Sequence, residues 1–160
     1  MWKTLAVGTI TLCIALRCST QTPSVQCLAD PGLDNRLNWE AEHATIAEGI
    51  VALQSPTGTD AAQIRQHLQG LKPHTNYTLS AKVRAVNTPS AQLSVDLYRD
   101  DGYDSPEQEL LVLPEQIDGT FRVFHKSLNT GALPDQPYLR VFTFSTVPIE
   151  VEELGLTETK

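Results

Sequence analysis

The feature that most constrains the fold is an alternation of apolar and polar residues with a period of two. In the stretch 77–85 the odd-numbered residues are aromatic or aliphatic and the even-numbered residues are polar, and the stretches 62–69 and 92–98 alternate similarly. Such alternation is typical of β-strands with one buried and one solvated face, because successive side chains point to opposite sides of a sheet. It predicts that six side chains are buried between two sheets: Leu79, Ala81, Val83, Leu93, Val95 and Leu97.

Several other segments are predicted to be strands. They cover residues 45–53, 110–113, 120–128, 138–145 and 149–156. Turn signals that contain Gly or Pro separate the strands, and no segment carries a helical period over three turns. Eight or nine short strands in about 125 residues predict an all-β fold, an antiparallel two-sheet β-sandwich.

Length and charge narrow the class of protein further. The chain has 160 residues, enough for one domain with a proper core. Acidic residues outnumber Lys and Arg by 19 to 12, which gives a formal net charge of -7, and the basic residues are scattered singly. This charge balance disfavours nucleic acids and anionic membrane surfaces as partners.

The N-terminus is predicted to be an export signal. Its apolar run, from Leu5 to Leu16, is too short to span a bilayer but suits a secretory signal. A polar, Pro-containing stretch follows it. The predicted organisation is therefore a signal over 1–17, a tether over 18–29, a sandwich domain over 30–156 and a tail over 157–160. The predicted location is secreted or cell envelope.

The cysteines leave three alternatives for the mature N-terminus. All three cysteines precede the domain, so no disulfide can form within it: Cys13, Cys18 and Cys27. Cys18 follows the apolar run as in a bacterial lipoprotein cleavage site, although Ala15 and Arg17 depart from that pattern. The alternatives are lipidation at Cys18, cleavage by ordinary signal peptidase, and a Cys18–Cys27 disulfide. Lipidation at Cys18 would be the one predicted contact with a membrane.

A segment at 70–83 reads Gly-Leu-Lys-Pro-His-Thr-Asn-Tyr-Thr-Leu-Ser-Ala-Lys-Val. Fibronectin type III domains carry a similar run, but the 83 residues that follow Tyr77 are too many for that fold. The segment also resembles one in carbohydrate-binding modules with a galactose-binding-like jelly roll, the cellulose- and xylan-binding group. The opening at 30–34 with Trp39, and the closing Val-Glu-Glu-Leu-Gly-Leu at 151–156, are similar to landmarks of the same family.

The resemblance implies a structural Ca²⁺ site that ties the first strand to the last. Asp34 and Glu152 stand where the family has carboxylates, and Glu153 is an alternative ligand. Asp replaces Glu at 34 and Glu replaces Asp at 152, which changes the reach of each side chain by one methylene. Carboxylate oxygens are ligands that Ca²⁺ prefers. The alternative is that the three acids are simply solvated.

The polar faces of the three alternating stretches form the predicted ligand surface. The residues predicted to bind are Arg65, Arg84, Asp96, Tyr98 and Tyr103. One of the two tyrosines would stack on a pyranose ring, and the other residues would bind polar groups of the sugar. Guanidinium groups match carboxylates, which favours an acidic or uronic sugar. The alternative is an ordinary solvated surface.

Motifs for catalysis are missing from the sequence. It has no nucleophile elbow, no Gly-rich phosphate loop and no His spacing typical of a zinc site. We therefore predict a non-enzymatic, exported carbohydrate-binding module for a polysaccharide or cell-surface glycan. The alternative function is an envelope adhesion or structural sandwich that binds protein partners. An accessory part of a glycoside hydrolase system is less favoured.

Overall fold

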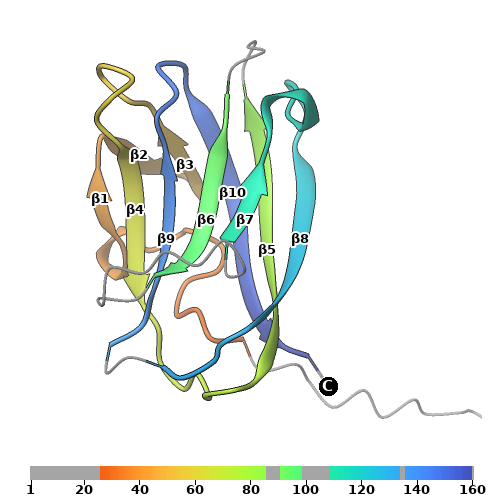
Figure 1. Ribbon diagram of the computed structural model, residues 1–160. Helices are drawn as coiled ribbons and strands as arrows, with labels where there is room; N and C mark the ends of the chain where they lie inside the picture. The colour runs from red at the N-terminus through yellow and green to blue at the C-terminus, as the bar shows by residue number, and fades with distance from the viewer. Residues whose placement is uncertain (1–25, 86–90, 99–108, 134–135, 160) are drawn as a thin grey trace, which may run out of the picture.

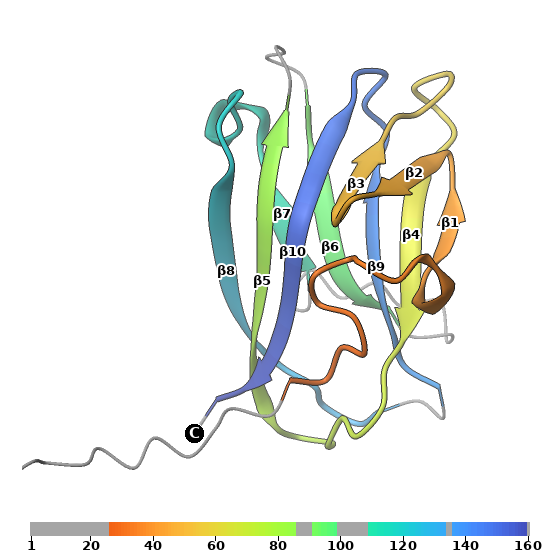
Figure 2. The same cartoon turned by 180° about the vertical axis from the view of Figure 1, so that it is seen from behind.

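The fold is a sandwich of two five-stranded antiparallel sheets, seen from opposite sides in Figures 1 and 2. A computed structural model describes residues 26–85, 91–98, 109–133 and 136–159. The front sheet of Figure 1 runs in the order β1 (Glu40–Glu42), β4 (Ala62–His67), β9 (Tyr138–Thr143), β6 (Leu93–Tyr98), β7 (Glu109–Val112). The back sheet runs in the order β2 (Ala44–Ala47), β3 (Ile50–Leu53), β10 (Ile149–Glu158), β5 (Asn76–Ala85), β8 (Arg122–Asn129).

Helical structure in the described ranges is limited to short 3-10 turns. They are η1 (Arg36–Asn38) and η3 (Pro114–Gln116). Within those same ranges, no helix is long and apolar enough to cross a membrane. The all-β class predicted from the alternation is therefore confirmed.

The core lies between the sheets, where the alternation placed it. All six side chains predicted to be buried are at most 4% exposed. They come from β5 in the back sheet and from β6 in the front sheet, so the two inner faces meet as in other sandwiches. The same alternation turns the remaining side chains of these strands outward.

The segment 45–53 forms a hairpin, so the prediction of one strand there is wrong. It contains β3 and nearly all of β2, and the two pair in antiparallel register. Glu48 and Gly49 at the turn have positive φ angles of 52° and 74°. A two-residue loop with both φ angles positive is a common hairpin turn, and it favours Gly. The Glu-Gly pair was the local signal for this turn.

The start of the described chain packs against the sandwich. The Cys27 amide donates a hydrogen bond to the Leu156 carbonyl at 3.0 Å, and Gln26 forms a β-bridge with Thr157. Cys27 and Leu28 are buried. Gln26 and Cys27, which the sequence pattern assigned to the tether, thus bond to β10 of the back sheet. Strand β10 also extends to Glu158, into the predicted tail.

Gly155 on β10 leaves room for the side-chain hydroxyl of Ser80, its cross-strand partner on β5. A Cβ atom on Gly155 would lie 2.4 Å from the Ser80 Oγ, well inside van der Waals contact. We expect Gly155→Ala to lower the free energy of unfolding by about 2 kcal/mol, the range typical of overpacking. Urea denaturation measures this loss. The double variant Gly155→Ala/Ser80→Ala removes the clashing oxygen and should recover most of it, and no recovery would contradict the steric explanation.

Candidate functional site

A row of charged side chains crosses the outer face of the front sheet. Cross-strand pairing aligns its five members, one from each strand, and we call it the charged row: Glu40, Arg65, Arg140, Asp96 and Glu109. Their strand neighbours Ile64, Val95 and Val141 are buried in the core, so the row itself faces outward.

Four of the five residues of the charged row form two ion pairs. Arg65 donates from Nε to Glu40 at 2.5 Å, and Arg140 binds Asp96 through two bonds of 3.2 and 2.7 Å. The hydrogen bond to Glu40 raises the pKa of Arg65, so this guanidinium stays charged. The two arginines oppose each other across β4 and β9, and each turns to an acid on its other side. Their like charges are thereby balanced.

Aromatic rings flank the charged row on both sides. The Arg140 guanidinium lies 4.4 Å from the centroid of the Phe142 ring, and that of Arg65 lies 5.9 Å from Tyr138. The Phe142 ring meets Phe144 edge-to-face, with centroids 5.9 Å apart. Arg140 covers part of Phe142, whereas Phe144 is 51% exposed. Phe144 therefore offers apolar ring surface to a ligand.

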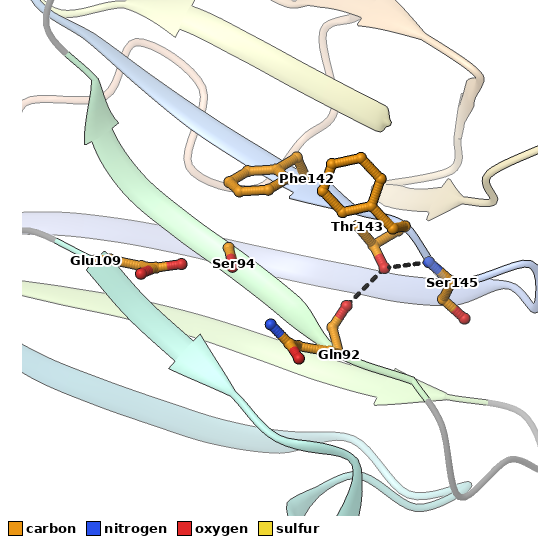
Figure 3. A pocket seen from close by; sticks show the side chains of 7 residues that line it. Gln92, Ser94, Glu109, Phe142, Thr143 and Ser145 are labelled. Atoms are coloured by element: carbon orange, nitrogen blue, oxygen red, sulfur yellow. Dashed lines mark hydrogen bonds between the residues drawn. The ribbon is translucent and has the colours of Figure 1, made fainter. Parts of the chain in front are cut away.

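A pocket of about 330 Å³ opens beside these rings (Figure 3). It is lined by Gln92, Ser94, Glu109, Phe142, Thr143, Phe144 and Ser145. The Thr143 hydroxyl donates to the Gln92 carbonyl at 2.6 Å and accepts from the Ser145 amide at 2.9 Å. These bonds hold β9 against the start of β6 and give the pocket a fixed polar wall. Figure 3 shows the Gln92 side chain beside this wall and the Glu109 side chain on the other side of Ser94.

The chemistry of this pocket suits a sugar. A pyranose needs a ring surface for its apolar face, and amide, hydroxyl and carboxylate groups for its hydroxyls. Phe144 supplies the ring surface, while Gln92, Ser94 and Glu109 supply the polar groups. Within the described ranges, no group forms a hydrogen bond or ion pair with the Glu109 carboxylate, so its oxygens can accept from ligand hydroxyls.

The predicted ligand residues divide between the two sheets. Arg65 and Asp96 lie in the charged row, whereas Arg84 lies on β5 in the back sheet. The prediction that all three residues share one face is therefore wrong, because β5 and β6 belong to different sheets. Tyr98 is the last residue of β6, and Tyr103 lies outside the described residues.

Arg84 has partners of its own on the back sheet. Its Nε donates to Glu150 at 2.6 Å, and its guanidinium lies 4.4 Å from the Phe121 centroid. The preference for an acidic sugar rested on the match between guanidinium groups and the carboxylates of a ligand. Because Arg65 and Arg84 both bind carboxylates of this chain, that preference loses its physical basis.

Sequence reasoning missed the residues that shape the pocket. Phe142 and Phe144 alternate with buried residues on the outward side of the predicted strand 138–145, and Arg140 precedes them with the same spacing. This period-two spacing was the available signal. Glu109 carried no such signal, since only pairing of β7 with β6 brings it beside Ser94 and Asp96.

The predicted calcium ligands lie near the contact between the N-terminal loop and β10. The Leu154 amide donates to the Pro31 carbonyl at 2.9 Å, and the Asp34 carboxylate lies against Gly49. Glu152 is paired with Lys82 at 2.6 Å, and Glu153 follows the bulge in β10. No three His, Cys, Asp or Glu side chains converge in the part of the chain that the structure describes.

Comparisons with known proteins identify the fold. No family model and no curated protein matches the sequence. A solved CBM4 structure superposes with a TM-score of 0.59 at 12% identity, over 82% of this chain and 99% of that chain. The second N-terminal cellulose-binding domain of Cellulomonas fimi β-1,4-glucanase C gives 0.56 at 14%, over 84% and 92%. The fold is that of a carbohydrate-binding module.

This module fold also occurs inside larger proteins. The enzymatically active domain of bacteriophage CBA120 tailspike protein 4 matches with a TM-score of 0.58 at 12% identity. The match covers 84% of this chain and 21% of that one. At such identities the carbohydrate-binding-module likeness establishes the architecture, and the function must be argued from the pocket.

Proposed function

We propose that this protein is an exported, non-catalytic module that binds a neutral glycan through the pocket on the front sheet. One observation carries the proposal. The half-exposed Phe144 ring adjoins a wall of amide, hydroxyl and carboxylate groups, which is the combination that a pyranose requires. The solved modules of this fold, one of them named as cellulose-binding, support the assignment.

The carboxylates of the pocket favour a neutral sugar and a non-catalytic role. Glycoside hydrolysis generally uses two carboxyl groups placed on either side of the scissile bond. Both oxygens of Asp96 accept from Arg140, so among the described residues Glu109 is the carboxylate that lines the pocket. Glu109 would also repel the carboxylate of a uronic sugar, because like charges destabilise each other in a partly desolvated site.

Binding to a glycan array, followed by titration calorimetry with the best ligands, tests this proposal. We expect neutral oligosaccharides to bind more tightly than uronate oligosaccharides of matched length. Phe144→Ala should weaken binding by at least about tenfold, because it removes the stacking surface. Val123→Ala is the matched control, since Val123 is a similarly exposed apolar residue on β8 of the back sheet.

Two results would contradict the proposal. Wild-type affinity in Phe144→Ala would move the site away from this pocket. Absence of binding to both neutral and acidic glycans would favour the alternative, an envelope adhesion or structural sandwich that binds protein.

Calcium binding near Asp34 remains a prediction of the family resemblance. If Ca²⁺ binds the folded chain alone, millimolar calcium should raise the melting temperature by mass action, and a chelator should reverse the rise. Asp34→Asn should abolish the calcium response, whereas Asp60→Asn, an exposed acid elsewhere, should retain it. A melting temperature that is the same with calcium and with chelator would remove Ca²⁺ from the function.

A further inference from the structure

We propose that the Asp96–Arg140 ion pair is a positioning element that holds the aromatic surface of the glycan site in its binding orientation. This inference rests on the proposed function, and it gives Asp96 a role without ligand contact. The ion pair acts through Phe142, which in turn contacts Phe144.

The Asp96–Arg140 ion pair has a bidentate geometry. Arg140 uses both Nε and one terminal nitrogen on the two oxygens of Asp96, so its guanidinium plane is fixed in direction. The Asp96 side chain is 8% exposed and that of Arg140 is 18% exposed. Shielding from water strengthens such a pair relative to a surface pair, which makes the orientation well defined.

The fixed guanidinium plane of Arg140 contacts the ring of Phe142. The guanidinium carbon lies 4.4 Å from the ring centroid, inside the range of favourable cation–π contacts. Arg140 and Phe142 are two residues apart on β9 and therefore share its outer face. The Phe142 ring is thus held between Arg140 on one side and the edge-to-face contact with Phe144 on the other.

Arg65 lies directly opposite Arg140 on β4, and its own charge is balanced by Glu40. Without Asp96, the guanidinium of Arg140 would lose the two hydrogen bonds that fix the direction of its plane, while the like charge of Arg65 would remain opposite it. The contact of that plane with Phe142 would then lose its fixed geometry, and with it the edge-to-face contact of Phe142 with Phe144.

Arg84 provides a matched control on the opposite face. It pairs with Glu150 on a neighbouring strand, and its guanidinium lies 4.4 Å from the Phe121 ring, as in the Arg140 arrangement. Arg84 and Phe121 are remote from the pocket because they belong to the back sheet side of the sandwich. Arg→Lys at either position keeps the charge but removes the planar fork and its stacking.

The experiment compares Arg140→Lys, Asp96→Asn and Arg84→Lys in the full chain. Glycan affinity is measured by calorimetry, and ring orientation is measured by ¹⁹F NMR of protein labelled with fluorophenylalanine. The chain has 4 Phe residues, and a Phe144→Leu variant assigns the signal of Phe144. We expect Arg140→Lys and Asp96→Asn to weaken binding about tenfold and to shift the Phe144 resonance. Arg84→Lys should change neither.

The outcomes separate this inference from the proposed function. If Arg140→Lys lowers the melting temperature but keeps wild-type affinity and an unchanged Phe144 resonance, the ion pair is only structural and the inference is overturned. If the wild-type chain binds no glycan, the proposed function fails. In that case the NMR measurement still tests the inference. An unchanged Phe144 resonance in Arg140→Lys overturns the claim that the ion pair orients the ring, and a shifted resonance supports that claim.

Discussion

Tyr77→Ala is expected to lower the free energy of unfolding by about 4 kcal/mol, the loss typical of truncating a fully buried aromatic residue. Tyr77 is completely buried, and its hydroxyl accepts a hydrogen bond from the Lys72 amide at 3.1 Å. The hydroxyl also contacts the Cys27 thiol. Truncation would therefore leave a cavity in the core and release the loop that precedes β5.

Two companion variants separate the ring of Tyr77 from its hydroxyl. Burial raises the pKa of Tyr77, so the hydroxyl stays protonated at neutral pH. Tyr77→Phe keeps the ring and should cost only about 1 to 2 kcal/mol, the value of one buried hydrogen bond. Urea denaturation monitored by circular dichroism gives both values. Equal losses in the two variants would show that packing of the ring contributes little.

Asp30→Ala is expected to lower the free energy of unfolding by about 3 kcal/mol, because a buried carboxylate with several charged hydrogen bonds is lost. Asp30 accepts from the Asp34 amide at 3.1 Å, the Asn35 amide at 2.8 Å and the Trp39 indole at 3.2 Å. Trp39 itself is buried in the core. Asp30 thereby joins the N-terminal loop to the sandwich.

The Trp39 indole signal reports this effect directly. In proton NMR, Asp30→Ala should shift the indole N–H resonance, since its acceptor is removed. Glu115→Ala is the control, because Glu115 is an exposed acid in η3, and its loss should change stability by less than about 0.5 kcal/mol. A fully stable Asp30→Ala variant would show that solvent replaces the carboxylate.

Both residues had been singled out as sequence landmarks, but their roles came from the structure. The run at 70–83 and the opening at 30–34 pointed to a family through their residue order. The structure shows that the Tyr77 hydroxyl and the Asp30 carboxylate each bind backbone amides of a neighbouring loop. Such hydrogen bonds are not readable from spacing, because they depend on the path of the loop in space.

The alternation of residues determined the strands, the class of fold and the side of each strand that is buried. A period of two sets which side chains face the core, because a shift by one residue would expose the whole apolar set to water. This local rule correctly gave the buried positions on β5 and β6. It also placed Arg65, Arg84 and Asp96 on the outer side of their strands, but it could not say which of the two outer faces each one joins.

Only the tertiary structure decided which strands share a sheet. A sandwich has two outer faces with the same pattern, and the choice depends on pairing between strands far apart in the chain. Pairing of β9 with β4 and β6 places Arg140 between Arg65 and Asp96, whereas pairing of β5 with β10 brings Arg84 to Glu150. These long-range pairings place an acidic partner beside each arginine and leave Phe144 exposed beside the pocket. The sequence of one segment could not show this, because the energy of a side chain depends on neighbours that its own segment does not contain.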